Sequence, residues 1–160
     1  MTRKTRIVLF TVLSLLIMAF IYGNSIPSIP ESRETSLSIA ALLRPLLDPK
    51  HRLDDEVYHI LVRKLAHFVE YGALGTSLTA LAAQFEWKKW HLPVAPMVVS
   101  VLVALSDEGL QYFTGRGNSM KDVGIDSCGA LCGMLFVLAV IWLIKQRKQV
   151  GGRTHVPFYQ

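Results

Sequence analysis

The sequence predicts an all-α, polytopic membrane protein: a bundle of four transmembrane helices with an irregular extracytoplasmic loop between the first and the second. Of the 160 residues, 51% are apolar and only 18% are charged, and long uncharged runs separate the charged residues. The formal net charge of +5 does not indicate binding to nucleic acid, because that would need basic residues clustered on a water-soluble face. With two cysteines in one apolar run, a disulfide framework is excluded as well.

Each predicted transmembrane helix corresponds to one uncharged run, since a membrane-spanning helix needs about 20 mostly apolar residues. The runs are 7–23, 71–85, 90–106 and 127–144. The second and third runs are short, so their helices must include polar residues at one end. We therefore divide the chain into a basic N-terminus with the first helix (1–24), an extracytoplasmic loop (25–63), a core of three helices (64–144) and a basic cytoplasmic tail (145–160).

The distribution of basic residues predicts a protein of the cell membrane whose N-terminus and C-terminus are both cytoplasmic. In that orientation the short cytoplasmic segments contain Arg3, Lys4, Arg6, Lys88, Lys89, Lys145, Arg147, Lys148 and Arg153. The basic tail would anchor the last helix to the anionic inner surface. The first run also fits a cleaved signal peptide, and in either case residues 24–63 lie outside.

The expected loop contains four prolines that interrupt any long helix: Pro27, Pro30, Pro45 and Pro49. Residues 37–47 are apolar enough for a short helix, which either lies in the membrane interface or forms a packed cap over the bundle.

With this topology, polar residues from three helix ends meet on the outer side of the membrane. Charges near membrane depth are expensive, so these side chains should face inward and bind one another or a ligand. The alternative is that they are interfacial and contact water and headgroups. The predicted binding residues are Lys64, His67, Glu70, Asp107, Glu108, Gln111, Arg116, Ser119 and Asp122, and the catalytic candidates are Glu70, His67 and Glu108.

Spacing refines this cluster. Four residues recur at helical intervals that favour one shared face: Lys64, His67, Glu70 and Tyr71. Arg116 lies in a Gly-flanked turn, where its planar side chain suits a phosphate or carboxylate ligand or, equally, an ion pair with a neighbouring acid.

Two further features of the pattern concern packing and metals. Gly129 and Gly133, four residues apart, favour close approach of another helix. The cluster offers nitrogen and oxygen atoms that metals accept, yet no tight metal-ligand motif occurs, so we assign neither a metal site nor a cofactor.

Three motifs in order give the chain a resemblance to a known family. They are Lys64-x-x-His67-Phe68-x-Glu70-Tyr71, then Asp107-Glu108-x-x-Gln111-x-Phe113, and then Gly115-Arg116-x-x-Ser119-x-x-Asp122-Val123 followed by Gly129 and Gly133. Together they resemble the VanZ-like membrane proteins, named for a teicoplanin-resistance protein. The resemblance covers residues 64–133 and departs from the family pattern at Thr114, where Pro is frequent, and at Asp126, where Asn is usual.

The resemblance implies a role in the cell envelope and in antibiotic resistance, and the residues leave three mechanisms open. The first is binding of a lipid-linked cell-wall precursor or a lipid-anchored glycopeptide, with Arg116 and Lys64 meeting its anionic groups. The second is an intramembrane enzyme that modifies a lipid or glycan carrier by carboxylate and His chemistry. The third, a proton-coupled transporter, would need a homo-oligomer, because four spans are few. The expected partners are membrane lipids and such a ligand.

Overall fold

The computed structural model describes residues 1–26, 29–85, 91–114 and 119–152. Over this part of the chain all regular structure is helical, which confirms the all-α class. The helices are α1 (Arg3–Ser25), α2 (Ile29–Leu47), α3 (Asp55–Ala82), α4 (His91–Phe113) and α5 (Met120–Gly152).

Three segments of the described residues are long and apolar enough to cross a membrane: Arg3–Ser25, Leu92–Phe113 and Met120–Gln149. They are consistent with a membrane protein. The segment Leu37–Leu47 of α2 is apolar but shorter. The second expected span belongs to α3, which is not among the three because its uncharged part begins only at Tyr71. A count of four spans therefore stays a prediction.

The prediction of an irregular loop over residues 25–63 is wrong for most of that segment. Residues 29–47 form α2, and α3 already begins at Asp55. Pro30 is tolerated because it lies in the first turn of α2, where its missing N–H has no partner to lose. Pro45 lies in the last turn, and the helix ends two residues later. The sequence placed the start of the next helix at residue 64, but Asp54 caps α3 much earlier by accepting a hydrogen bond from the Glu56 N–H at 3.0 Å.

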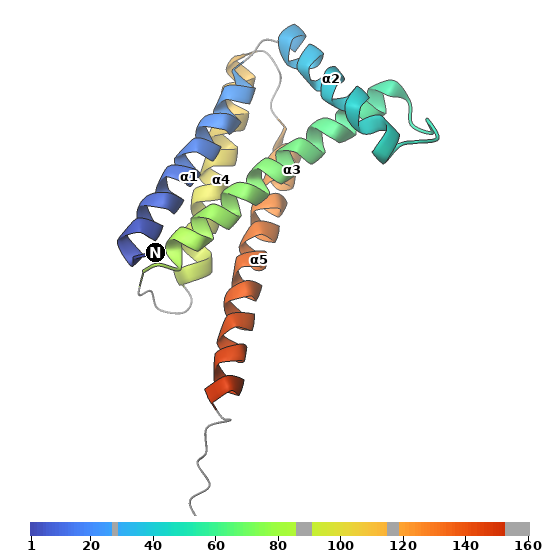
Figure 1. Ribbon diagram of the computed structural model, residues 1–160. Coiled ribbons are helices and arrows are strands. Elements are labelled where there is room, and N and C mark those ends of the chain that lie inside the picture. Colours follow the sequence, from blue (N-terminus) through green and yellow to red (C-terminus); the bar gives the residue numbers. More distant parts are fainter. Residues whose placement is uncertain (27–28, 86–90, 115–118, 153–160) are drawn as a thin grey trace, which may run out of the picture.

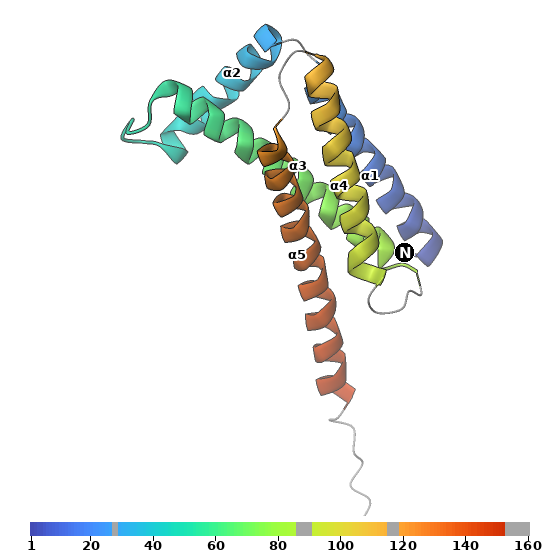
Figure 2. The same cartoon turned by 180° about the vertical axis from the view of Figure 1, so that it is seen from behind.

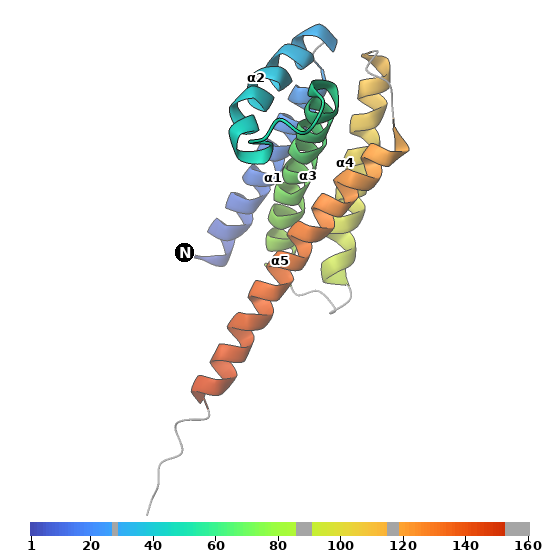
Figure 3. The same cartoon turned by 90° about the vertical axis from the view of Figure 1, so that its right-hand side faces the viewer.

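The helices α1, α3, α4 and α5 run side by side, and α2 lies across the first part of α3 at one end of the molecule (Figures 1 and 2). Helix α3 contacts all four other helices. The N-terminus of α1 lies at the same end as the end of α3, where Arg3 Nε donates to the Gln84 carbonyl at 2.7 Å. The last part of α5 extends beyond the bundle (Figure 3).

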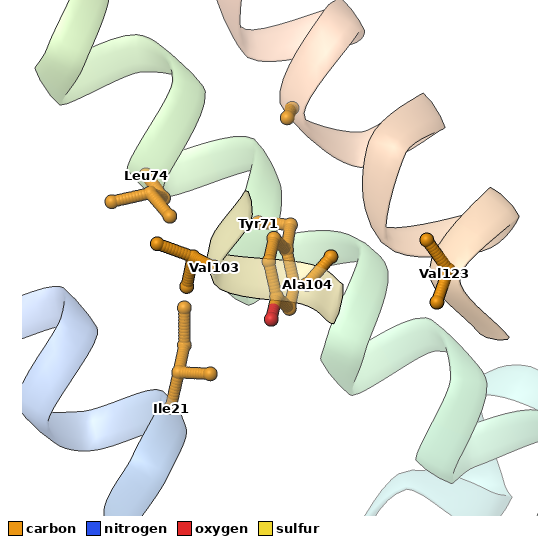
Figure 4. Packing of buried hydrophobic residues seen from close by; sticks show 7 residues of the cluster. Ile21, Tyr71, Leu74, Val103, Ala104 and Val123 are labelled. Atoms are coloured by element: carbon orange, nitrogen blue, oxygen red, sulfur yellow. The ribbon is translucent and has the colours of Figure 1, made fainter. Parts of the chain in front are cut away.

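A small apolar core joins the four side-by-side helices (Figure 4). Its buried members are Ile21, Tyr71, Leu74, Val103, Ala104, Val123 and Ala130. Large apolar side chains cover the outside as well, as shown by Leu16 at 62% exposure and Phe136 at 64%. An apolar outer surface around a partly polar interior is what a bilayer environment favours.

The close helix approach predicted from Gly129 and Gly133 is confirmed. A Cβ added to Gly129 would overlap the Phe68 carbonyl of α3, and a Cβ on Gly133 would overlap the Gly72 carbonyl. The backbones of α3 and α5 are therefore in direct contact, and this contact fixes which side chains of the two helices meet.

Candidate functional site

The candidate site lies where the last turns of α4 and the first turns of α5 meet the middle of α3. Four polar side chains are buried here: Asp107 and Asp126 are 0% exposed, Gln111 1% and Glu108 4%. Buried carboxylates at these helix ends agree with the inward-facing alternative of the sequence analysis rather than with the interfacial one.

Three helices contribute one side chain each to the centre of the site. His67 of α3, Asp107 of α4 and Asp126 of α5 each present a ligand atom, and these three atoms lie within 4.8 Å of one another. The His67 Nδ1 and Asp126 Oδ1 atoms are 3.7 Å apart. We call these three residues the central triad.

A hydrogen bond orients the Asp107 carboxylate. Gln111, one turn later on α4, donates from Nε2 to Asp107 Oδ2 at 3.2 Å. The same amide nitrogen lies 3.4 Å from the Ser25 hydroxyl at the end of α1. This arrangement links α1 to α4 and leaves the Oδ1 atom of Asp107 facing the interior without a hydrogen bond within the described residues.

Glu108, the residue after Asp107, binds the start of α5 instead of the triad. Its Oε2 atom accepts a hydrogen bond of 2.7 Å from the backbone N–H of Ser119, the residue before α5 begins. An acidic side chain near the first N–H groups of a helix is stabilising, because those groups lack intrahelical partners and carry partial positive charge. Glu108 therefore helps to hold the start of α5 against α4.

A cavity of about 180 Å³ lies between α3 and α5 beside the central triad. Its lining residues are His59, Ile60, Arg63, Lys64, His67, Asp122, Ile125 and Asp126. Lys64 forms an ion pair with Asp122 at this cavity. Two triad residues, His67 and Asp126, thus face a space that also holds two basic side chains.

Glu70 does not join this cavity. Its Oε1 atom accepts a hydrogen bond of 3.0 Å from Asn24 Nδ2 of α1, whereas Lys64 and His67 meet residues of α5. The prediction that these three residues share one face is therefore wrong for Glu70. At about 100° per residue, the six positions from Lys64 to Glu70 leave the helix roughly 120° short of two full turns, which directs Glu70 toward a different neighbour.

Three residues of the site were not among the predicted binding residues. Asp126 is one of them, although its spacing one turn after Asp122, on the stripe that leads to Gly129, already placed its carboxylate with the cluster. His59 and Arg63 precede the matched motifs and were not predicted to belong to the cluster, yet both line the cavity. Arg116, which was predicted to bind an anion, lies outside the described residues.

Comparison with known proteins gives a family match. A family model described as VanZ/LLP1 matches residues 10–144. No curated protein and no solved structure matches the chain significantly. The matched range includes every residue of the central triad and every residue that lines the cavity.

Proposed function

The chain belongs to the VanZ/LLP1 family, and from this membership we propose that it lowers susceptibility to the glycopeptide teicoplanin as a multi-pass protein of the bacterial cell envelope. In this proposal the cavity between α3 and α5 binds a lipid-linked cell-wall precursor or the lipid-anchored drug itself. The observation that supports it is the combination of lining groups, which includes the cations Arg63 and Lys64 beside acidic and imidazole side chains.

The lining chemistry suits an anionic, hydroxyl-rich headgroup. Arginine and lysine side chains bind phosphate and carboxylate oxygens by charge-assisted hydrogen bonds, and the planar arginine side chain can bind two oxygens together. Asp122 and Asp126 offer acceptors for sugar or peptide donors. Because Lys64 is already paired with Asp122, an anionic group entering the cavity would compete with that carboxylate for the ammonium.

We also propose that α3 crosses the membrane as the second of four spans, with both chain termini in the cytoplasm. Helix α3 contacts every other helix, so less of its surface needs to be apolar than in a helix exposed to lipid. The contact of Arg3 with Gln84 supports a second span that returns across the membrane, since it brings the start of α1 and the end of α3 to one end of the bundle. The cavity would then lie on the outer side.

Growth inhibition of a sensitive host that expresses the protein tests this function. We expect wild type to raise the inhibitory concentration of teicoplanin, and Arg63→Gln to remove that protection. Lys121→Gln is the matched control, because Lys121 is exposed and lies near the start of α5 without lining the cavity. Immunoblots of membrane fractions must show equal amounts of each variant.

Vancomycin, which lacks the lipid anchor, separates the two ligands in the same cells. Protection against teicoplanin alone indicates capture of the anchored drug, whereas protection against both indicates binding of the shared precursor. Equal teicoplanin susceptibility with and without well-expressed wild-type protein would refute the proposed role.

One observation favours a second candidate function, an intramembrane enzyme that modifies a lipid or glycan carrier. His67, at the wall of the cavity, lies beside the buried carboxylate of Asp126, an arrangement in which a histidine can act as a general acid or base. Of the other catalytic candidates, Glu70 is bonded to Asn24 and Glu108 to Ser119. Incubation of purified protein with a labelled polyprenyl diphosphate should give a product that His67→Asn does not form. An unchanged lipid would eliminate this candidate for that carrier.

A further inference from the structure

The central triad contains more negative charge than the described side chains around it neutralise. Asp107 and Asp126 are both fully buried. The carboxylates whose charge acts on Asp126 are Asp107, Glu108, Asp122 and Glu70. Lys64, the ammonium group of the cavity, is paired with Asp122, and Arg63 acts on Glu108. A buried carboxylate needs a partner of opposite charge or a metal ion to be tolerated in its ionised form.

The hydrogen bonding of the two aspartates is an independent observation that points to a ligand. Both oxygens of Asp126 and the Oδ1 atom of Asp107 accept no hydrogen bond from any described residue. The fourth oxygen, Asp107 Oδ2, is held by Gln111. Three buried acceptor atoms, on two residues that each lie close to His67, are thus without a hydrogen bond, while the fourth is satisfied.

We propose that His67, Asp107 and Asp126 bind a divalent transition metal ion, either Zn²⁺ or Mn²⁺. One imidazole nitrogen and two carboxylates form a mixed ligand set that both ions accept, whereas Mg²⁺ and Ca²⁺ prefer oxygen ligands alone. Two of these residues, His67 and Asp126, also line the cavity proposed above to bind the drug or the precursor, but metal binding is measured without either ligand and is therefore tested independently.

The spacing of the triad fits a metal after a small closing movement. Metal–ligand bonds of roughly 2.0 to 2.2 Å place two tetrahedral ligands about 3.4 Å apart. His67 Nδ1 and Asp126 Oδ1 are 3.7 Å apart, and all three ligand atoms lie within 4.8 Å of one another. We expect side-chain rotation to bring the ligand atoms together when the ion binds.

The surroundings supply two further features of a metal site. Gln111 donates a hydrogen bond to the Oδ2 atom of Asp107, and such supporting hydrogen bonds orient metal ligands. The cavity lined by His67 and Asp126 offers a path for the ion to enter. Three protein ligands leave room in the coordination shell for water or for a ligand oxygen from that cavity.

Metal content of the full-length protein in detergent tests the site directly. Purified wild type is equilibrated separately with Zn²⁺, Mn²⁺ or Mg²⁺, passed through a desalting column and analysed by mass spectrometry of the elements. We expect about one Zn²⁺ or Mn²⁺ per chain and no retained Mg²⁺. Asp126→Asn and His67→Asn should each lower the retained metal at least tenfold.

Lys121→Gln is the control, because Lys121 is exposed on the same helix as Asp126 and neither lines the cavity nor belongs to the triad. It should retain the metal. A second measurement avoids dependence on variants that fail to fold: the thermal unfolding temperature of wild type should rise with Zn²⁺ or Mn²⁺ and fall back with a chelator. Retention of Mg²⁺ alone, equal retention by wild type and Asp126→Asn, or no retention by folded wild type would each overturn the proposal.

Discussion

Gly133 of α5 lies against the backbone of Gly72 of α3 so closely that a Cβ on Gly133 would overlap the Gly72 carbonyl and lie 2.7 Å from the Thr76 hydroxyl. One turn earlier on α5, Gly129 meets the Phe68 carbonyl in the same way. Because Phe68 follows His67 and Gly129 follows Asp126 by three positions, this backbone contact sets the register that brings His67 opposite Asp126.

Replacement of Gly129 by alanine should therefore destabilise the protein and disturb the site together. The added methyl group forces α3 and α5 apart, and overpacking of this kind costs typically about 1–3 kcal/mol. Gly124→Ala on the same helix is the control, since nothing lies within 4 Å of a Cβ there and alanine favours the helix. Thermal unfolding in detergent measures the effect. Equal unfolding temperatures for the two variants would contradict the register argument.

A hydrogen bond between two buried serines joins α1 to α3, and its loss should be measurable. The hydroxyls of Ser14 and Ser77 are 2.8 Å apart, and both residues are nearly fully buried. Side-chain hydrogen bonds between membrane helices contribute about 0.6 kcal/mol on average and up to about 1.7 kcal/mol. A double-mutant cycle with Ser14→Ala and Ser77→Ala, measured by reversible unfolding, should give a coupling in this range.

Ser100 provides the comparison for that cycle. It is fully buried on α4, and its hydroxyl has no hydrogen-bond partner within the described residues. Ser100→Ala should therefore be neutral or stabilising, because it removes a buried polar group that no partner satisfies. If Ser100→Ala destabilised the protein as much as Ser77→Ala, packing alone would explain both results.

The parts of the fold that sequence could predict are those set by local pattern. The uncharged runs 7–23 and 127–144 lie within α1 and α5, since an apolar run of that length has one stable form in a membrane. The burial of Asp107, Glu108 and Gln111 was likewise expected, because their cost at membrane depth forces them inward.

The parts that sequence could not predict depend on contacts between distant residues. The corner of α2 and α3 is held by the Arg44 side chain, which lies over the Tyr58 ring at 4.7 Å and donates to the Leu53 carbonyl at 2.8 Å. Tyr58 in turn donates to the Ala40 carbonyl at 3.2 Å. No periodic pattern in the sequence predicts these contacts, and the nearby prolines favoured the prediction of a loop.

This corner should loosen in acid. Backbone N–H groups of Arg52 and Leu53 donate to the Asp48 carboxylate at 2.9 and 3.1 Å. The Arg52 N–H is the largest of the favourable contacts that lower the pKa of Asp48, followed by Leu53 and by the charge of Arg44. A lowered folded pKa means that the stabilisation is complete above the unfolded value of about 3.9 and is lost as the pH falls through the folded value.

Amide hydrogen exchange measures this effect at Arg52 and Leu53. Protection factors corrected for intrinsic exchange should be constant between roughly pH 5 and 7 and should decline below about pH 4. Asp48→Asn should lower protection throughout and remove the decline. Lys50→Gln is the control, because Lys50 is exposed in the same turn and is not among the groups that lower the pKa of Asp48. An unchanged pH profile in Asp48→Asn would show that another group controls this turn.

Whether α3 crosses the membrane can be decided by finding on which side of the membrane the residues after α3 lie. We expect four spans, although three segments meet the length and apolarity of a span by themselves. The two exposed cysteines of α5, Cys128 and Cys132, are first replaced by serine. Single cysteines at Lys50, Phe85 or Gln149 are then treated in intact cells with a maleimide that does not cross membranes.

With four spans, Lys50→Cys reacts from outside, while Phe85→Cys and Gln149→Cys react only after the membrane is permeabilised. If α1, α4 and α5 alone crossed, residue 85 would stay on the outer side with residue 50, and residue 149 would emerge outside as well. Labelling of Phe85→Cys and Gln149→Cys in intact cells would therefore refute the fourth span. It would also mean that α1, α4 and α5 do not shield the polar side chains of α3 from lipid, since a helix outside the bilayer needs no such shielding.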